Sequence, residues 1–305
     1  MKITPGKYMG LKRISTTTGC FQMMALDQRN SLKKMLKKFK EPKDEDLVVV
    51  KRSILKNLSE YVSAVLVDPE YGFFENLKYI HRNSGVILSL EKSGYVEKEG
   101  GRISQVVEDE IVKKAKKWGV DAVKLLIYWS NNASEEVKKH QRDLVKKMGE
   151  MALESDILYI LEILTYGVNE AEKTKAILSA IKEFSGDDYH VDLFKVEPVV
   201  KEERHGLSKD DIFNATNGKP WVILSGGMDV ETFEKIVELN CELGASGVLA
   251  GRVIWKDSVR FIDDHDKMDL FLKTTGVRNV EIIRRAMSLA LPYHQTPYYR
   301  DITVS

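Results

Sequence analysis

The stretch VDLFKVEP at residues 191–198 decides the fold, because an apolar, β-branched run of this length predicts a short buried strand. Lys195 lies in its middle, although lysine is almost never fully buried without a partner. Two earlier runs repeat the pattern: AVKLLIY carries Lys124, and LYILEIL carries Glu162. Three ionisable groups on three consecutive strand-like segments predict an active site in which a lysine does chemistry.

Eight runs of this kind occur along the chain, at residues 20–27, 64–69, 85–91, 122–129, 158–164, 193–198, 221–226 and 247–252. Each is continuously apolar rather than alternating, as expected for parallel strands that are covered on both faces. Charged segments of helical period, such as residues 103–118, lie between the runs and predict helices, and some begin with a capping residue such as Ser134. The pattern therefore predicts an α/β protein in which strands and helices alternate.

Eight strands alternating with helices in 305 residues predict one (β/α)8 TIM barrel. A doubly wound sheet, the competing fold, would require a glycine-rich turn after its first strand, and ALDQRN at residues 25–30 has no glycine. No linker or repeat divides the chain, so we expect a single domain over residues 1–305. We expect the tyrosine-rich C-terminal tail, residues 291–305, to pack on the barrel or on a neighbouring subunit. The alternative is that it folds over the mouth and delivers a proton.

The overall composition excludes several classes of protein. The 47 Lys and Arg residues nearly cancel the 46 Asp and Glu residues, which leaves no electrostatic footprint for nucleic acid. The two cysteines, Cys20 and Cys241, lack a CxxC spacing, so a disulfide scaffold is not expected and a reducing cytoplasm is the simplest location. No apolar stretch approaches the ~20 residues of a membrane span. We expect a cytoplasmic protein with neither nucleic-acid nor membrane partners.

The active site of such a barrel forms at the carboxyl ends of its strands. Those ends are unusually polar in this chain and offer Asp27, Gln28, Arg29, Asp68, Glu70, Glu91, Lys92, Lys124, Glu162, Lys195, Glu197, Ser225, Gly226, Gly227, Gly251 and Arg252. Because side chains alternate along a strand, Lys195 and Glu197 should point the same way. If Lys195 points into the mouth, it faces a ring of acids and a second cation.

A nucleophilic lysine must be neutral near pH 7, and a fall of about three units from its usual pKa corresponds to roughly 4 kcal/mol. Burial of Lys195 supplies part of this change, and a nearby ammonium such as Lys124 supplies more. The amine would form an imine with a ketone, and Glu162 would carry protons during carbon–carbon bond making or breaking. Two alternatives stay open on this evidence: Lys124 could be the reactive lysine, or these groups could form structural ion pairs.

Ser225, Gly226 and Gly227 follow one late strand, and Gly251 with Arg252 follows the next. Backbone N–H groups of such loops commonly bind phosphate in barrels, and an arginine can add paired N–H donors. Tight strand-to-helix turns are the alternative explanation for the glycines. The six histidines form no ligand pair at strand ends, so we expect neither a metal ion nor another cofactor.

These motifs together resemble the class I tagatose 1,6-bisphosphate aldolases and their bacterial sulfofructose-phosphate aldolase relatives. The matching segments are ALDQR at 25–29, LVDPEYG at 66–72, EKSGY at 91–95, DAVKLL at 121–126, LEIL at 161–164, FKVE at 194–197, LSGG at 224–227 and AGR at 250–252. The resemblance implies a barrel that cleaves a ketose bisphosphate, without a metal ion, to glycerone phosphate and glyceraldehyde 3-phosphate.

The resemblance also implies a role for each site residue. Lys195 would be the Schiff-base lysine and Glu162 the acid/base shuttle, while Lys124 and Asp27 would complete the charged pocket. Ser225 and Arg252 would bind a phosphate. We expect Gln28, Arg29, Gly226, Gly251 and Lys92 to join the substrate-binding set, in an enzyme that binds a sugar phosphate and forms a homo-oligomer.

The substrate within the family stays open at this point. Residues 221–255 are closer to the sulfofructose-phosphate branch, whereas residues 68–72 and 91–95 are closer to the tagatose branch. Tagatose 1,6-bisphosphate is the leading expectation, with fructose 1,6-bisphosphate as a possible second substrate. The alternatives are a sulfofructose-phosphate aldolase, a barrel lyase or isomerase whose lysines only bind phosphate, and a non-catalytic metabolite-sensing regulator.

Overall fold

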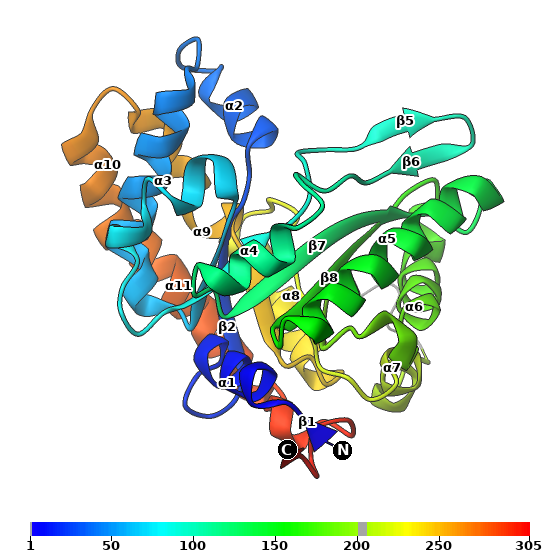
Figure 1. Cartoon of the computed structure of the whole chain (residues 1–305). Helices are drawn as coiled ribbons and strands as arrows, with labels where there is room; N and C mark the ends of the chain where they lie inside the picture. Colours follow the sequence, from blue (N-terminus) through cyan, green and yellow to red (C-terminus); the bar gives the residue numbers. More distant parts are fainter. Residues whose placement is uncertain (1, 201–205) are drawn as a thin grey trace.

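Eight parallel strands close into a barrel in the computed structural model, which describes residues 2–200 and 206–305 (Figure 1). In chain order the strands are β2 (Phe21–Leu26), β3 (Ala64–Val67), β4 (Gly85–Ser89), β7 (Ala122–Trp129), β8 (Leu158–Thr165), β9 (Leu193–Val196), β10 (Trp221–Ile223) and β11 (Gly247–Ala250). Each strand pairs with the next one in this order, and β11 pairs with β2 to close the ring. The expected (β/α)8 barrel is confirmed.

Helices lie outside the ring, as expected for a barrel whose strands are covered on both faces. They are α1 (Pro5–Ile14), α2 (Asn30–Leu36), α3 (Asp44–Leu58), α4 (Ile111–Lys117), α5 (Glu135–Glu154), α6 (Lys173–Glu183), α7 (Lys209–Thr216), α8 (Val230–Glu242), α9 (Arg252–Trp255), α10 (His265–Phe271) and α11 (Val277–Ala286). The predicted cap at Ser134 is present, because its hydroxyl accepts a hydrogen bond from the Val137 backbone nitrogen at 3.3 Å.

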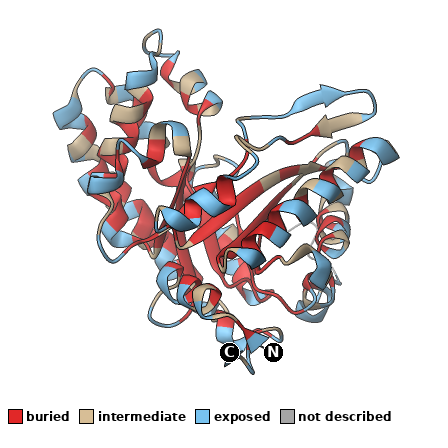
Figure 2. Ribbon diagram, viewed as in Figure 1, coloured by how far each residue is buried: buried red, intermediate tan, exposed pale blue. Residues whose placement is uncertain are grey.

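The strands separate two apolar layers, and their buried residues appear as the red centre of Figure 2. Side chains that point into the barrel, such as Met23, Leu66 and Ile160, form one cluster. Side chains that point outward, such as Met24 and Leu161, pack against the helices in a second cluster. Because both faces of each strand are buried, the runs are continuously apolar in sequence.

Two parts of the N-terminal half differ from the expectation. A helix was expected over residues 103–118, but α4 begins only at Ile111, and a hairpin of β5 (Val96–Lys98) and β6 (Gly101–Ile103) precedes it. The hairpin strands are short and largely exposed, so they carry no apolar run that could mark them in the sequence. Helix α1 was also not predicted.

The C-terminal tail packs on the base of the barrel, at the amino ends of the strands. The ring of Tyr293 stacks on Phe21 at 5.9 Å between centroids, and Tyr299 is fully buried with its hydroxyl 3.3 Å from the Asp192 carbonyl oxygen. Phe21 begins β2 and Asp192 precedes β9. The tail therefore packs on its own barrel, at the end opposite the predicted active site, and delivers no proton at the mouth.

Candidate active site

The exposure of inward-facing side chains shows where the barrel interior opens. Along β7 these positions are Ala122, Lys124, Leu126 and Tyr128, because side chains alternate along a strand. The first two are fully buried, whereas Leu126 and Tyr128 are half-buried. The opening therefore lies at the carboxyl end of the strand, directly above Lys124.

Lys195 and Glu162 meet at this depth in the barrel. The Lys195 amine lies 2.8 Å from Glu162 Oε2, and the two residues are direct register partners on β9 and β8. The Lys124 ammonium lies 3.2 Å from the same oxygen. All three side chains are at least nine-tenths buried. The structure thus brings together the two lysines and the carboxylate that the sequence singled out.

Lys124 is the centre of the charge cluster. Besides Glu162, its ammonium contacts Asp27 Oδ2 at 2.7 Å and Glu91 Oε1 at 2.5 Å. Burial alone would lower the pKa of Lys124, but the three carboxylates, led by Asp27, hold that pKa well above its usual value. These carboxylates therefore favour the charged form of Lys124.

The charges of Lys124 and Lys195 also determine the ionisation state of Asp27. Burial disfavours its charged form, yet the ammonium groups of Lys124 and Lys195 hold the pKa of this carboxyl far below its usual value. Asp27 therefore stays ionised and keeps Lys124 in place. Three carboxylates (Asp27, Glu91 and Glu162) face two lysines, so the cluster can accept a proton.

Glu91 is the site residue that the sequence reasoning placed at a strand end without assigning it a role. Its second oxygen accepts a hydrogen bond from the Leu126 backbone nitrogen at 3.0 Å, which fixes the carboxylate beside Lys124. A signal was available in the sequence: Ile87, Ser89 and Glu91 are spaced two residues apart in the apolar run 85–91, which predicts that they share one face. In the structure β4 ends at Ser89, and Glu91 follows it.

Three predicted substrate-binding residues, Gln28 and Arg29 after β2 and Lys92 after β4, differ in their surroundings. Arg29 is buried and donates to Glu70 Oε1 at 3.0 Å and to the Glu91 carbonyl oxygen at 2.5 Å, so its guanidinium is largely engaged within the protein. Gln28 has a buried Oε1 without a hydrogen-bond partner in the described part of the chain, which leaves this acceptor available to a ligand. Lys92 lies exposed on the loop that leads to the β5–β6 hairpin.

The loops after β10 and β11 lie side by side, as predicted. Gly226 adopts a left-handed conformation with φ +58°, and its carbonyl oxygen accepts a hydrogen bond from Arg252 Nη2 at 3.2 Å. Gly251 packs so closely on β2 that a Cβ atom would lie 2.2 Å from the Ala25 carbonyl oxygen. Ser225 is buried at the start of the first loop.

A pocket of about 400 Å³ adjoins these two loops. The cations that line it are Lys38, Arg252, Lys256 and Arg260. One acidic residue, Asp257, also lines this pocket. The excess of positive charge beside two glycine-containing loops fits an anion such as a phosphate.

Glu197 follows β9 on the same face as Lys195, but its carboxylate pairs with residues outside the charge cluster. Its Oε2 accepts hydrogen bonds from the Thr165 backbone nitrogen and hydroxyl, both at 2.8 Å, and its Oε1 pairs with Lys173 at 2.8 Å. Glu197 therefore ties β8, β9 and α6 together at the rim.

The family of the chain follows from comparison with known proteins. The family model described as DeoC/LacD family aldolase matches residues 21–257, which include every strand of the barrel. The chain belongs to this family. This aldolase carries the charge cluster and both glycine loops within the matched region.

Similar proteins of known name are tagatose 1,6-diphosphate aldolases. It is 30% identical to the tagatose 1,6-diphosphate aldolase 2 of Enterococcus faecalis, over 94% of this chain and 95% of that protein. It is 28% identical to the tagatose 1,6-diphosphate aldolase of Staphylococcus aureus, over 92% and 95%. Both relatives are matched along nearly their whole length.

A solved structure is similar in fold alone. The fructose-bisphosphate aldolase from Plasmodium falciparum, solved in complex with TRAP and a small-molecule inhibitor, superposes with a TM-score of 0.70. It covers 95% of this chain and 97% of its own, at 14% sequence identity. The expected family and fold are both confirmed.

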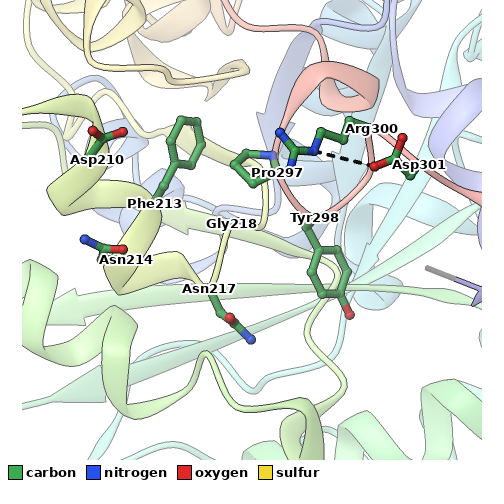
Figure 3. A pocket seen from close by; sticks show the side chains of 9 residues that line it. All are labelled: Asp210, Phe213, Asn214, Asn217, Gly218, Pro297, Tyr298, Arg300 and Asp301. Atoms are coloured by element: carbon green, nitrogen blue, oxygen red, sulfur yellow. Dashed lines mark ion pairs between the residues drawn. The ribbon is translucent and has the colours of Figure 1, made fainter.

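The described residues of the aldolase contain neither a cluster of metal ligands nor a membrane-spanning helix. Over residues 2–200 and 206–305, no group of three or more His, Cys, Asp or Glu side chains is arranged to hold a metal ion, and no helix could span a membrane. A pocket of about 710 Å³ lies between α7 and the tail. Figure 3 shows side chains that line it, such as Phe213 and Tyr298. It lies towards the base of the barrel, away from Lys195.

Proposed function

We propose that this aldolase forms a Schiff base through Lys195 and cleaves a ketohexose phosphate. The contact of 2.8 Å between the Lys195 amine and Glu162, beside the permanently charged Lys124, carries the proposal. A lysine buried at the open end of a barrel, with one carboxylate in reach, can pass its proton to that carboxylate and become a nucleophile.

The proposed reaction follows from these contacts. The neutral Lys195 amine attacks the C2 carbonyl of the sugar to give a carbinolamine. Glu162 returns the proton that it took from Lys195 to the carbinolamine hydroxyl, which leaves as water, so an iminium forms and Glu162 is again a carboxylate. Glu162 then takes the proton of the C4 hydroxyl while the C3–C4 bond breaks, and the bonding electrons move into the iminium to give an enamine. The aldehyde leaves, Glu162 returns the proton to C3, and water releases glycerone phosphate. Lys124 stabilises the changing charge on Glu162 from 3.2 Å.

We propose tagatose 1,6-bisphosphate as the main substrate and fructose 1,6-bisphosphate as a second one. Two features support this choice: the names of the relatives, and the basic pocket beside Gly226 and Arg252 that suits a phosphate. Residues 221–255 resemble the sulfofructose-phosphate branch in sequence, but no contact among the described residues favours a sulfo-sugar phosphate or a purely sensing role. We further propose that the enzyme works in the cytoplasm as a homo-oligomer.

Reductive trapping tests the Schiff base directly. The enzyme is incubated with glycerone phosphate and borohydride, and intact mass and peptide mapping locate the adduct. We expect one reduced adduct, on Lys195, and cleavage activity that survives EDTA. An adduct on Lys124, or no adduct together with activity lost to the chelator, would contradict the mechanism.

A further inference from the structure

An arginine outside the charge cluster is held between two aromatic rings. The guanidinium carbon of Arg102, on β6, lies 4.3 Å from the ring centroid of Tyr95 and 4.7 Å from that of Tyr166. The Arg102 backbone nitrogen also donates to the Tyr166 hydroxyl at 2.9 Å. Stacking of this kind orients the guanidinium plane and leaves its N–H edges free to bind an anion in two-pronged fashion.

The charge of Arg102 is only weakly neutralised by the protein. In the described part of the chain its side chain pairs with Glu97 alone, at 3.5 Å, and the Glu97 side chain is 69% exposed. Such surface pairs contribute at most ~1 kcal/mol, so an arriving anion can replace Glu97. Arg29, by contrast, is buried and engaged by Glu70 and by a carbonyl oxygen.

The aromatic clasp, defined as Tyr95, Arg102 and Tyr166, stands on the rim of the mouth. The Tyr95 ring packs edge-to-face on Tyr128 at 4.8 Å, and Tyr128 is the outermost inward-facing position of β7. Tyr166 directly follows β8. In Figure 1 the hairpin that carries Arg102 extends beside the tip of β7.

Tyr128 connects the clasp to the reacting groups. Burial raises the pKa of this phenol, and the negative charges of Glu162 and Glu91 raise it further, so the ring lies within electrostatic reach of the charge cluster. No hydrogen bond from its hydroxyl is found within residues 2–200 and 206–305. Tyr128 lies four residues after Lys124 on the inward face of β7 and contacts Tyr95, so it connects the clasp to the strand that carries Lys124.

The clasp lies opposite the basic pocket in the ring of strands. Three strands separate β11 from β7 in either direction around the barrel, so Arg252 and Tyr128 occupy opposite sides of the mouth. A ketohexose 1,6-bisphosphate carries its phosphates at its two ends and its reacting carbons between them. With one phosphate at the loops after β10 and β11, the other extends towards the rim at β7 and β8.

We propose that Arg102, held by Tyr95 and Tyr166, binds the phosphate on the aldehyde half of the substrate. This assignment rests on the proposed aldolase reaction and adds the group that recognises the second phosphate. It predicts that Arg102 contributes to binding of glyceraldehyde 3-phosphate but not of glycerone phosphate.

The test uses Arg102→Gln in the condensation direction, with glycerone phosphate as donor and either glyceraldehyde 3-phosphate or unphosphorylated glyceraldehyde as acceptor. We expect kcat/KM for the phosphorylated acceptor to fall about 10- to 100-fold, as for lost charge-assisted hydrogen bonds. The value for glyceraldehyde and the rate of borohydride trapping with glycerone phosphate should stay near wild type.

Arg142→Gln is the matched control. Arg142 also stacks on an aromatic ring, with its guanidinium carbon 5.5 Å from the Trp129 centroid, and its side chain is 32% exposed, as is that of Arg102. It lies on α5 and pairs with Glu135 and Glu183. We expect this variant to leave both acceptors and the trapping rate unchanged.

The outcomes separate the two proposals. If the wild-type enzyme is trapped on Lys195 but Arg102→Gln affects both acceptors equally, or neither, the assignment of Arg102 is wrong and the aldolase mechanism stands. If glycerone phosphate gives no adduct with the wild-type enzyme, the mechanism is wrong, and the assignment of Arg102 falls with it.

Discussion

The base and the mouth of the barrel each hold a buried lysine that contacts a carboxylate, but the surroundings of the two pairs differ. At the base, Lys7 Nζ lies 2.8 and 3.0 Å from the two carboxylate oxygens of Asp192. The Tyr159 backbone nitrogen donates to the same carboxylate at 2.8 Å, and the tail covers the pair with Tyr299. Both carboxylate oxygens of Asp192 therefore have hydrogen-bond partners within the protein.

At the mouth, Lys195 contacts Glu162 through one oxygen, and that oxygen is shared with Lys124. The inward-facing side chains above them are half-buried, so the interior opens there. Burial of a lysine beside a carboxylate therefore does not by itself mark a reactive amine. The distinguishing features are an incompletely satisfied carboxylate and access from solution.

The largest expected effect comes from replacing the lysine of each pair. Lys195→Met should reduce kcat by more than ~10⁴-fold, equivalent to about 5.5 kcal/mol, and change stability little, because Glu162 keeps Lys124 as a partner. Lys7→Met should leave kcat of the folded enzyme unchanged but lower the free energy of unfolding by about 3–5 kcal/mol, because Asp192 stays buried without its cation. Steady-state kinetics and urea unfolding measure both quantities. Similar changes of kcat and of the free energy of unfolding in the two variants would contradict this distinction between the lysines of the mouth and the base.

A smaller effect is expected when the carboxylate at the mouth loses its ability to accept a proton. Glu162→Gln should lower kcat by about 10²- to 10⁴-fold and leave KM near wild type, because the amide keeps its shape but cannot act as a base. Glu197→Gln is the control, since Glu197 contacts Thr165 and Lys173 instead. Equal losses of kcat in the two variants would show that Glu162 is no special proton carrier.

The smallest effect concerns the pH dependence of stability at the mouth. Because the pKa of Asp27 is lower in the folded than in the unfolded state, its contribution is present above the unfolded pKa of about 3.9 and is lost as pH falls through the folded value. Lys124 has a raised pKa, so its contribution is lost only as pH rises through that folded value.

Asp27→Asn should remove the loss of stability that protonation of Asp27 causes at acidic pH. Between pH 7 and pH 3, the wild-type enzyme should lose on the order of 1 kcal/mol more stability than the variant, as measured by urea unfolding at each pH. Equal slopes for the two proteins would show that Asp27 is not a strongly stabilised carboxylate.

The barrel and the centre of its site were predictable because both depend on local patterns. Each strand is buried on both faces, so each is visible as an apolar run, and a charge inside such a run is conspicuous. Lys124, Glu162 and Lys195 were found in this way. The family resemblance then favoured Lys195 over Lys124, and the raised pKa of Lys124 in the structure supports the same choice.

Features that depend on side-chain partners or on exposed strands were harder to predict. Glu91 was visible at a strand end, but its contact with Lys124 depends on the register between β4 and β7. Arg29 was expected to bind substrate, yet its pairing with Glu70 depends on a loop after β3. The β5–β6 hairpin, which carries Arg102, has too little apolar periodicity to be recognised.

The two ends of the chain meet at the base, where β1 (Lys2–Ile3) and β12 (Thr303–Val304) form a two-stranded parallel sheet (Figure 1). The Ser305 backbone nitrogen also donates to the Ile3 carbonyl oxygen at 3.1 Å. A short peptide would therefore span the gap between residues 2 and 305, and a break opened in a surface loop would leave the ring of strands undisturbed. A peptide attached to either of these two segments would likewise project from the base of the barrel, at the end opposite Lys195 and Glu162.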